Sequence, residues 1–408
     1  MLKINQIAII SGGLLLLVLA MPSYVFMIFE TSSMAAGIFI LACTVFLIYF
    51  CLIVLTSSHK FSPVNSQSAL IILWLIFLHG IIAYIFLDGF DLRRFFLSYL
   101  LFLQVIVAAI MFLQMALNIS NEAVNASIKF AFYILFFSGV AATFGLNPWA
   151  INRHKPVFFF AEPSHYAMVF LPLLLYMQVI STTRIWKFIL VLSSYFLAFS
   201  LESMLLLIGI TAVFLLSLPL TKFFMTASFM IILIVFNSNN LEYYISRVNF
   251  SDSSENFSTL AFLSGWERTF LNLYDTFLFG VGFQQFGIVG NQGVIQDKLR
   301  SIGAHGLNLL DGGALATKLL GELGLIGIIL LILYINYFLK SFIRVRKFLL
   351  GHRSLDSYLE VYFLSIFLMY SMDLFFRSAG YFSSSGFLFI VSILWMLSKK
   401  LSNYKFSL

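Results

Sequence analysis

The chain has 408 residues, of which 61% are hydrophobic and only 10% are charged, whereas globular domains contain roughly 45–50% apolar and 25% charged residues. A soluble core cannot use this much apolar surface, so the sequence predicts an integral membrane protein. The net charge of +7 is the excess of Lys and Arg that cytoplasmic loops of such proteins carry, and it does not indicate nucleic-acid binding.

The apolar runs predict an all-α polytopic membrane protein. The first run is longer than the apolar core of a signal peptide, so we expect it to be a spanning helix. A bilayer core requires about 20 consecutive apolar residues per helix, and by this criterion we expect about twelve transmembrane helices. They run near 8–28, 34–56, 68–87, 94–116, 127–146, 164–181, 185–200, 203–219, 222–236, 314–339, 358–375 and 381–399.

Clusters of Lys and Arg set the expected orientation. Residues 340–353 contain five Lys or Arg and residues 399–405 contain three, so both segments are expected to be cytoplasmic. Alternation across the spans then places both termini in the cytoplasm. It divides the chain into N-terminal transmembrane helices (1–236), one large external loop (237–313), and C-terminal transmembrane helices with a cytoplasmic tail (314–408).

The external loop is the only long non-spanning segment, and loops of this length are uncommon unless they are functional. Its apolar stretch Trp266–Phe279 is expected to form a helix along the membrane surface. The following Gly280-Val281-Gly282 is expected to be a tight turn, because the sequence around it lacks the context of a nucleotide-binding loop.

A carboxylate, a proline and an imidazole stand together at the start of the sixth predicted span. Proline is favoured at the first helical position, so the helix is expected to begin at Pro163 with Glu162 just before it. Glu162 is a candidate general base or sugar ligand, and His165 is a candidate partner in the same site. The alternatives are that Glu162 caps the helix and that His165 bonds a backbone group.

Arginines on the expected external side are unusual, because positive charge is normally enriched on the cytoplasmic side. A guanidinium binds phosphate through two parallel hydrogen bonds and stays charged at neutral pH. Arg153, Arg247, Arg268 and Arg377 are therefore predicted to bind pyrophosphate or glycan. For Arg247, Arg268 and Arg377 the alternatives are pairing with Glu267 or Asp373 and snorkelling to lipid headgroups, and for Arg153 the alternative is an ordinary interface anchor.

The entry of the tenth predicted span carries further charges. Lys318 and Glu322 stand four residues apart on one helical face and are expected to pair. His305, upstream of them, is a further acid–base candidate. The sequence contains no Asp-x-Asp pair, no His-Glu-x-x-His motif and no cysteine cluster, so we predict neither a metal nor another cofactor.

Three segments resemble the bacterial O-antigen polymerase and O-antigen ligase superfamily, and they occur in the order expected for it. They are Phe160-Ala161-Glu162-Pro163-Ser164 before a span, Ser264-Gly265-Trp266-Glu267-Arg268 with the later Phe279-Gly280-Val281-Gly282-Phe283, and Leu320-Gly321-Glu322-Leu323-Gly324-Leu325-Ile326-Gly327. The resemblance covers roughly residues 150–385.

The resemblance implies a GT-C-like bundle in the bacterial inner membrane that transfers a glycan from undecaprenyl pyrophosphate, without a metal, on the outer face. Its partners would be the undecaprenyl-pyrophosphate-linked oligosaccharide, membrane lipid and a chain-length regulator protein. The polymerase branch adds the growing glycan to the next lipid-linked repeat unit. The ligase branch moves the finished glycan onto lipid A-core.

Two observations separate these possibilities. The ligase pattern of His-Asn ahead of the Glu-x-Gly is replaced here by Asp311-Gly312-Gly313, which favours the polymerase branch and puts a ligase-type role of His305 in doubt. A lipid-linked oligosaccharide transporter is the alternative from another class. Transporters bind substrate near the bilayer midplane, whereas the predicted spans are largely free of charge at their centres.

Overall fold

The computed structural model describes residues 4–55, 67–148, 155–218, 256–304, 306–351 and 357–405. In these ranges the regular structure is helical, apart from two isolated β-bridges. The helices are α1 (Ile4–Ile28), α2 (Ala35–Leu55), α3 (Gln67–Phe86), α4 (Leu92–Leu117), α5 (Asn121–Thr143), α6 (Pro163–Ile180), α7 (Arg184–Ser200), α8 (Met204–Leu216), α11 (Phe257–Asp275), α12 (Val294–Ser301), α13 (Leu315–Leu349), α14 (Tyr358–Met369), α15 (Ser371–Phe375) and α16 (Ser384–Lys405).

Eight helices in the described part of the chain are long and apolar enough to cross a membrane, namely α1 to α6, α13, and α14 together with α15. The apolar helices α8 and Ser384–Lys399 of α16 are shorter. The protein is therefore an all-α polytopic membrane protein, as its composition predicts. Eleven predicted spans coincide with helices, but the ninth, 222–236, lies outside the described residues, so the number twelve stays a prediction.

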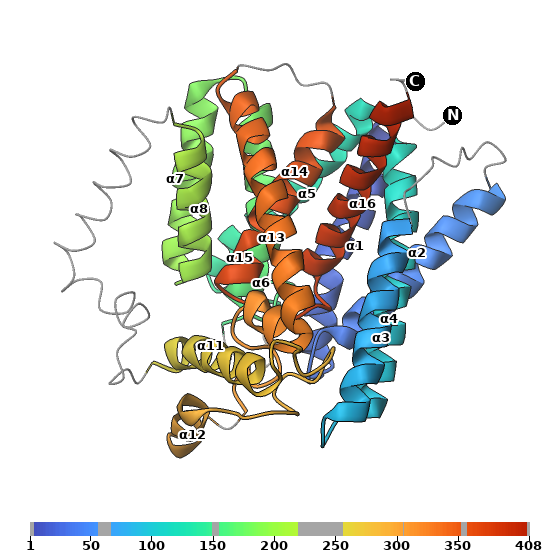
Figure 1. Ribbon diagram of the computed structural model, residues 1–408. Coiled ribbons are helices and arrows are strands. Elements are labelled where there is room, and N and C mark those ends of the chain that lie inside the picture. The colour runs from blue at the N-terminus through green and yellow to red at the C-terminus, as the bar shows by residue number, and fades with distance from the viewer. Residues whose placement is uncertain are drawn as a thin grey trace.

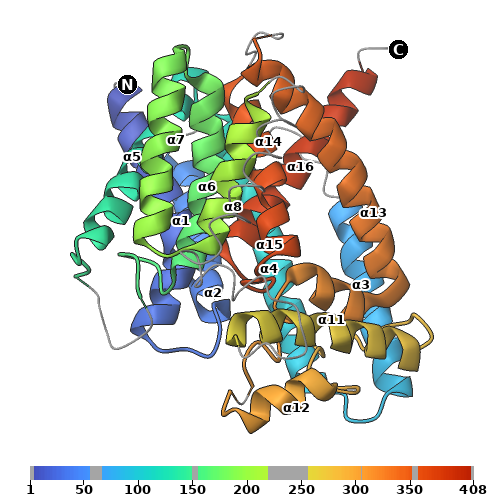
Figure 2. The same cartoon turned by 90° about the vertical axis from the view of Figure 1, so that its left-hand side faces the viewer.

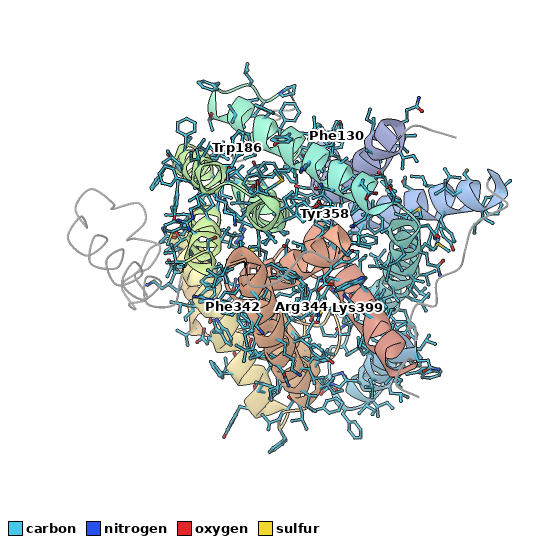
Figure 3. The ribbon with its side chains drawn as sticks, turned by 90° about the horizontal axis from the view of Figure 1, so that it is seen from above. Phe130, Trp186, Phe342, Arg344, Tyr358 and Lys399 are labelled. Carbon is cyan, nitrogen blue, oxygen red and sulfur yellow. The ribbon has the colours of Figure 1, made fainter. Side chains whose placement is uncertain are left out.

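The two ends of the bundle are formed by different parts of the chain. The start of α1 and the end of α16 lie at one end, which also carries Arg344 and Lys399 and is named the Arg344 end (Figures 1 and 3). Helices α11 and α12 cover the opposite end, named the Glu162 end because α6 begins there (Figures 1 and 2). The predicted cytoplasmic clusters and the described part of the predicted external loop thus lie at opposite ends.

A buried ion cluster joins three helices at the Arg344 end. The Glu360 carboxylate, near the start of α14, is 1% exposed and pairs with Arg344 of α13 and with Lys399 of α16. Lys399 also lies 5.2 Å from the ring centroid of Trp395. Because a buried charge is strongly destabilised without a partner, these contacts fix α13 and α16 around α14.

Helices α6 and α14 form the centre of the bundle, and the other helices surround them. Every residue of α6 from Tyr166 to Val179 is buried, and so is every residue of α14 from Glu360 to Met369. Outer helices such as α3 instead expose large apolar side chains, which in a membrane face lipid. The central position of α6 brings its first residues to the middle of the Glu162 end.

Helix α13 is bent at Gly324, whose φ of 54° and ψ of −125° are not helical. The part before the bend, from Leu315, is almost entirely buried, whereas Leu325 and Ile329 after it are 55% and 50% exposed. The Leu325 N–H donates to the Leu278 carbonyl at 2.8 Å, so the chain after α11 supplies a partner where the helix is interrupted. The sequence predicted a span at 314–339, but the helix continues to Leu349.

Candidate functional site

Glu162 and Arg377 form an accessible ion pair at the Glu162 end. Helix α6 begins at Pro163 as predicted, but the Glu162 side chain makes no capping hydrogen bond, so the capping alternative is wrong. Its Oε2 lies 3.3 Å from Arg377 Nη2 and accepts a hydrogen bond from Ser164 Oγ at 3.0 Å. The two paired side chains are 36% and 29% exposed.

The electrostatics keep Glu162 ionised. Burial raises the pKa of its carboxyl, but His165, Arg377 and the Ser164 hydroxyl together lower it to about 2. Glu162 is therefore a carboxylate at neutral pH, and it holds the guanidinium of Arg377 in place.

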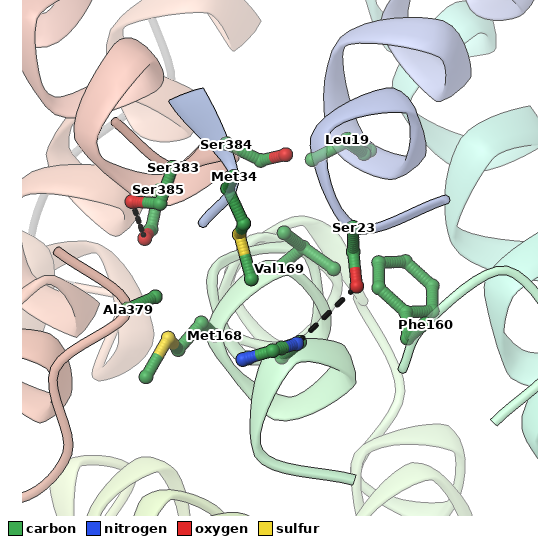
Figure 4. Close-up of a pocket in the computed structure, with 11 residues that line it drawn as sticks. Leu19, Ser23, Met34, Phe160, Met168, Val169, Ala379, Ser383, Ser384 and Ser385 are labelled. Atoms are coloured by element: carbon green, nitrogen blue, oxygen red, sulfur yellow. Dashed lines mark hydrogen bonds between the residues drawn. The ribbon is translucent and has the colours of Figure 1, made fainter. Parts of the chain in front are cut away.

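His165 connects the start of α6 to α1. Its Nδ1 lies 3.3 Å from Ser23 Oγ (Figure 4), and this oxygen also accepts the Ala161 N–H at 3.0 Å. The imidazole interacts electrostatically with Glu162, Arg377 and Asp311, so the structure brings it into the same cluster. The alternative that His165 bonds a backbone group is wrong, because its hydrogen-bond partner is the Ser23 hydroxyl.

Asp311 is a second accessible carboxylate in this cluster. The Ser378 N–H donates to the Gly313 carbonyl at 2.9 Å, which ties the segment before α13 to the loop that carries Arg377. Asp311 Oδ1 lies 3.5 Å from Lys318 Nζ, and its side chain is 46% exposed while that of Lys318 is 2% exposed. A Cβ at Gly380 would lie 3.2 Å from the same Asp311 oxygen, a tight contact, and the φ of 78° at this position also favours glycine.

The sequence predicted that Lys318 pairs with Glu322, but in the structure the two side chains hydrogen-bond other groups. Lys318 Nζ lies 3.5 Å from both Asp311 Oδ1 and Gln284 Oε1, and 5.2 Å from the ring centroid of Tyr381. Glu322 Oε1 instead accepts the backbone N–H of Phe286 at 3.3 Å. Lys318 and Glu322 therefore hydrogen-bond different partners, although both lie on one face of α13.

Asp373 stabilises the loop that carries Arg377. It is 1% exposed, and its carboxylate accepts the Ala379 N–H at 3.1 Å and the hydroxyl of Ser385. These two bonds link Asp373 of α15 to the loop that follows it and to the start of α16. Arg377 hydrogen-bonds Glu162 rather than Asp373, its nearer carboxylate in the sequence.

Arg268 is buried and bonds structural groups, so it does not belong to the accessible cluster of Glu162, Arg377 and Asp311. Its side chain is 1% exposed and donates to the Leu309 carbonyl, to Gln296 Oε1 at 3.0 Å and to Ser264 Oγ at 3.3 Å. Burial lowers the pKa of the guanidinium to about 10, which leaves it charged at neutral pH. These contacts connect α11, α12 and the segment before α13.

Glu267, the neighbour of Arg268, binds a different helix. Its two carboxylate oxygens accept the first amides of α12, from Val294 and Ile295, at 2.9 Å each. The pairing of Glu267 with Arg268, left open above, is therefore not a hydrogen-bonded pair.

Three candidate residues, Arg153, Arg247 and His305, lie outside the described residues. No group of three potential metal ligands occurs within the part of the chain that the structure describes.

Two small cavities border α6, and Ser385 lines both of them. One is lined by His165, Ser23 and Ser383 among others (Figure 4). The other is lined by Asp373 and Pro172 among others. Each has room for about one water molecule and none for a sugar residue. A glycan would therefore meet this site from its exposed side, where Glu162, Arg377 and Asp311 are accessible.

Comparisons of this chain with family models, curated proteins and solved structures found no match.

Proposed function

We propose that this membrane protein is a metal-independent glycosyltransferase of the polysaccharide polymerase type. It transfers a growing glycan from undecaprenyl pyrophosphate to the next lipid-linked repeat unit, on the outer face of the bacterial inner membrane. The observation that carries the proposal is the accessible Glu162–Arg377 pair with Asp311 beside it, at the end of the bundle away from the Arg344 cluster.

The contacts between the segments that resemble the polymerase and ligase superfamily support this proposal. The turn after α11 donates to α13, from Val281 N–H to the Gly321 carbonyl at 3.0 Å and from Gly282 N–H to the Glu322 carbonyl at 2.8 Å. Gly280 and Gly282 have φ of 90° and 99°, as a tight turn requires. The second and third of these segments are thus bonded to each other, while the first supplies Glu162.

The chemistry of such a transfer matches the groups at this end. The bond between C1 of the donor sugar and the pyrophosphate oxygen breaks, its electron pair leaves with pyrophosphate, and C1 bonds the acceptor oxygen. A guanidinium carries five N–H donors, so Arg377 can bind a phosphate oxygen while one nitrogen contacts Glu162. Stabilising the charge that develops on the leaving group is the contribution expected of Arg377.

The acceptor hydroxyl must lose a proton, and the two carboxylates differ in their fitness to receive it. Glu162 is ion-paired and has a pKa of about 2, which makes it a weak base. Asp311 also has a cationic neighbour, Lys318, but its side chain is 46% exposed against 36% for Glu162, so a substrate hydroxyl can reach it more readily. We therefore assign the base to Asp311 and the positioning of Arg377 to Glu162.

The test is transfer by the purified protein in liposomes, with a lipid-linked repeat unit, a chelator and products resolved by length. The wild type should produce a ladder of multiples. Arg377→Ala should lower the rate by about 100-fold or more, the size of effect seen when a charge-stabilising donor is removed. Arg300→Ala is the matched control, because Arg300 is an exposed arginine of α12 paired with Asp297.

An unchanged ladder in Arg377→Ala would overturn the role of the ion pair. A wild-type protein that makes no ladder but moves a finished glycan onto added lipid A-core would be a ligase, and the polymerase proposal would be wrong.

A further inference from the structure

Helix α11 has the polarity opposite to that of a helix on a water-soluble surface. Its polar residues Ser264, Arg268, Thr269 and Asn272 are buried against the protein. The Thr269 hydroxyl, for example, donates to the Thr317 carbonyl of α13 at 2.9 Å. An amphipathic helix on a soluble protein turns its apolar side inward and its polar side to water, whereas α11 buries these four polar side chains.

An aromatic stripe runs along the outward side of α11 and past its end, with Phe262, Trp266, Phe270 and Tyr274 in the helix and Phe277 just after it. The first four are spaced four residues apart and so lie along one helical face. The rings of Trp266 and Phe270 stack with centroids 6.1 Å apart. Exposure rises along the stripe, from 64% at Phe270 to 83% at Tyr274 and 94% at Phe277.

Helix α11 lies across the bundle rather than along it, and it does not lie at the outermost level. It runs crosswise in both side views, while α3 extends beyond it (Figures 1 and 2). Just after α11, the Phe279 carbonyl bonds Nε2 of His79 in α3 at 2.9 Å, and the two rings stack 4.3 Å apart. Along the axis of the bundle, His79 of α3 therefore lies at the level of the chain just after α11.

Beyond His79, α3 stays apolar and exposed. Ile82, Ile85 and Phe86 are 41%, 66% and 77% exposed, and Phe86 ends the helix. At a rise of 1.5 Å per residue, Phe86 lies about 10 Å further out than His79. The apolar layer that covers α3 therefore extends past the level of α11.

We propose that α11 is immersed sideways in the acyl-chain layer of the leaflet at the Glu162 end, with its aromatic stripe in contact with lipid. The stripe continues into the exposed face of α13, which begins at Leu325 directly beside Leu278. The lipid surface of the bundle is thus unbroken from the spanning helices onto α11. This proposal depends on no enzymatic activity.

The test measures the quenching of Trp266 fluorescence in liposomes. A variant keeps Trp266 and replaces Trp74, Trp149, Trp186 and Trp395 by Phe. Lipids brominated on their acyl chains should quench it by the same fraction as a variant that keeps only Trp74, which is 62% exposed on α3. A variant that keeps only Trp395, which is 8% exposed, is the shielded control.

A second variant, Phe277→Trp in a chain without other tryptophans, repeats the measurement at the most exposed position of the stripe. Stronger quenching by headgroup-attached quenchers or by aqueous acrylamide would place α11 on the membrane surface or in water and overturn the proposal. Shielding of both positions from every quencher, as for Trp395, would mean that protein covers the stripe, and would overturn it too. Thermal unfolding confirms that each variant is folded.

Discussion

Arg268 and Arg377 carry the same guanidinium in surroundings that give it different tasks. Arg377 is 29% exposed and pairs with one carboxylate that is itself accessible. Arg268 is 1% exposed, and its two terminal nitrogens donate to a carbonyl, a hydroxyl and a side-chain amide of the protein. A ligand phosphate can reach the first guanidinium without displacing structural bonds, and it cannot reach the second in this way.

Arg268→Ala should therefore act on stability. The variant leaves the Leu309 carbonyl without its side-chain donor and removes one of the two donors to Gln296 Oε1, the other being the Ser264 hydroxyl. Each buried group left unpaired costs about 1–3 kcal/mol. We expect a clear fall in the thermal unfolding temperature in detergent, whereas Arg377→Ala should leave that temperature nearly unchanged. A normal unfolding temperature in Arg268→Ala with lost activity would instead indicate a direct role in transfer.

Glu162 makes the stability of the protein dependent on acidic pH. Its pKa is lowered in the folded state from 4.5 to about 2, so the folded state favours the carboxylate. The resulting stabilisation is complete above pH 4.5 and is lost as the pH falls towards 2. Glu162→Gln should therefore unfold at a lower temperature than the wild type at pH 7, and this difference should shrink as the pH approaches 3. A difference that does not change with pH would contradict the ion pair.

The residues of this site could be predicted only in part. Glu162, His165 and Arg377 stand out in the sequence because charged and imidazole groups are rare in an apolar chain. Asp311 reads locally as the entry of a helix, and its place beside the loop that carries Arg377 depends on the bond between Ser378 and Gly313, two residues far apart in the chain. Short motifs cannot reveal a contact of that kind.

At the scale of the elements, hydropathy locates the helices well but not their bends. The start of α6 at Pro163 follows from local chemistry, and it was predicted to the residue. The bend of α13 at Gly324 follows from the approach of the chain after α11, which has no local signature among several Leu-Gly pairs. The apolar pattern continues through the bend, so hydropathy predicts the span but not the bend.

Gly324→Ala tests whether this bend is required. The φ of 54° is strained for alanine, and a Cβ there would lie 2.1 Å from the Leu278 carbonyl oxygen. We expect loss of most of the folded protein, or of transfer where folded protein remains. Gly13→Ala in α1 is the control, because a Cβ there meets nothing within 4 Å and alanine favours the helix by about 1 kcal/mol. Equal behaviour of the two variants in both assays would contradict the requirement.

At the scale of the whole molecule, positive charge is present at both ends, but the carboxylates around it are arranged differently. At the Arg344 end, Arg344 and Lys399 surround a single buried carboxylate, Glu360. At the Glu162 end, Arg377 and Lys318 alternate with Glu162 and Asp311. The first arrangement fits a cytoplasmic rim that is basic overall, and the second fits a site where opposite charges act on a substrate.

The orientation of the bundle decides whether that site faces the outer side of the membrane. After replacement of Cys43 and Cys51 by serine, a single cysteine is placed at Asp297 in α12 or at Lys347 in α13, both exposed positions at opposite ends. A membrane-impermeant maleimide should label Asp297→Cys in spheroplasts and Lys347→Cys only after permeabilisation. The reverse pattern would put the Glu162 end in the cytoplasm, where the proposed outer-face transfer cannot occur. Labelling of both from one side would contradict the arrangement of the bundle itself, since α13 crosses from one end to the other.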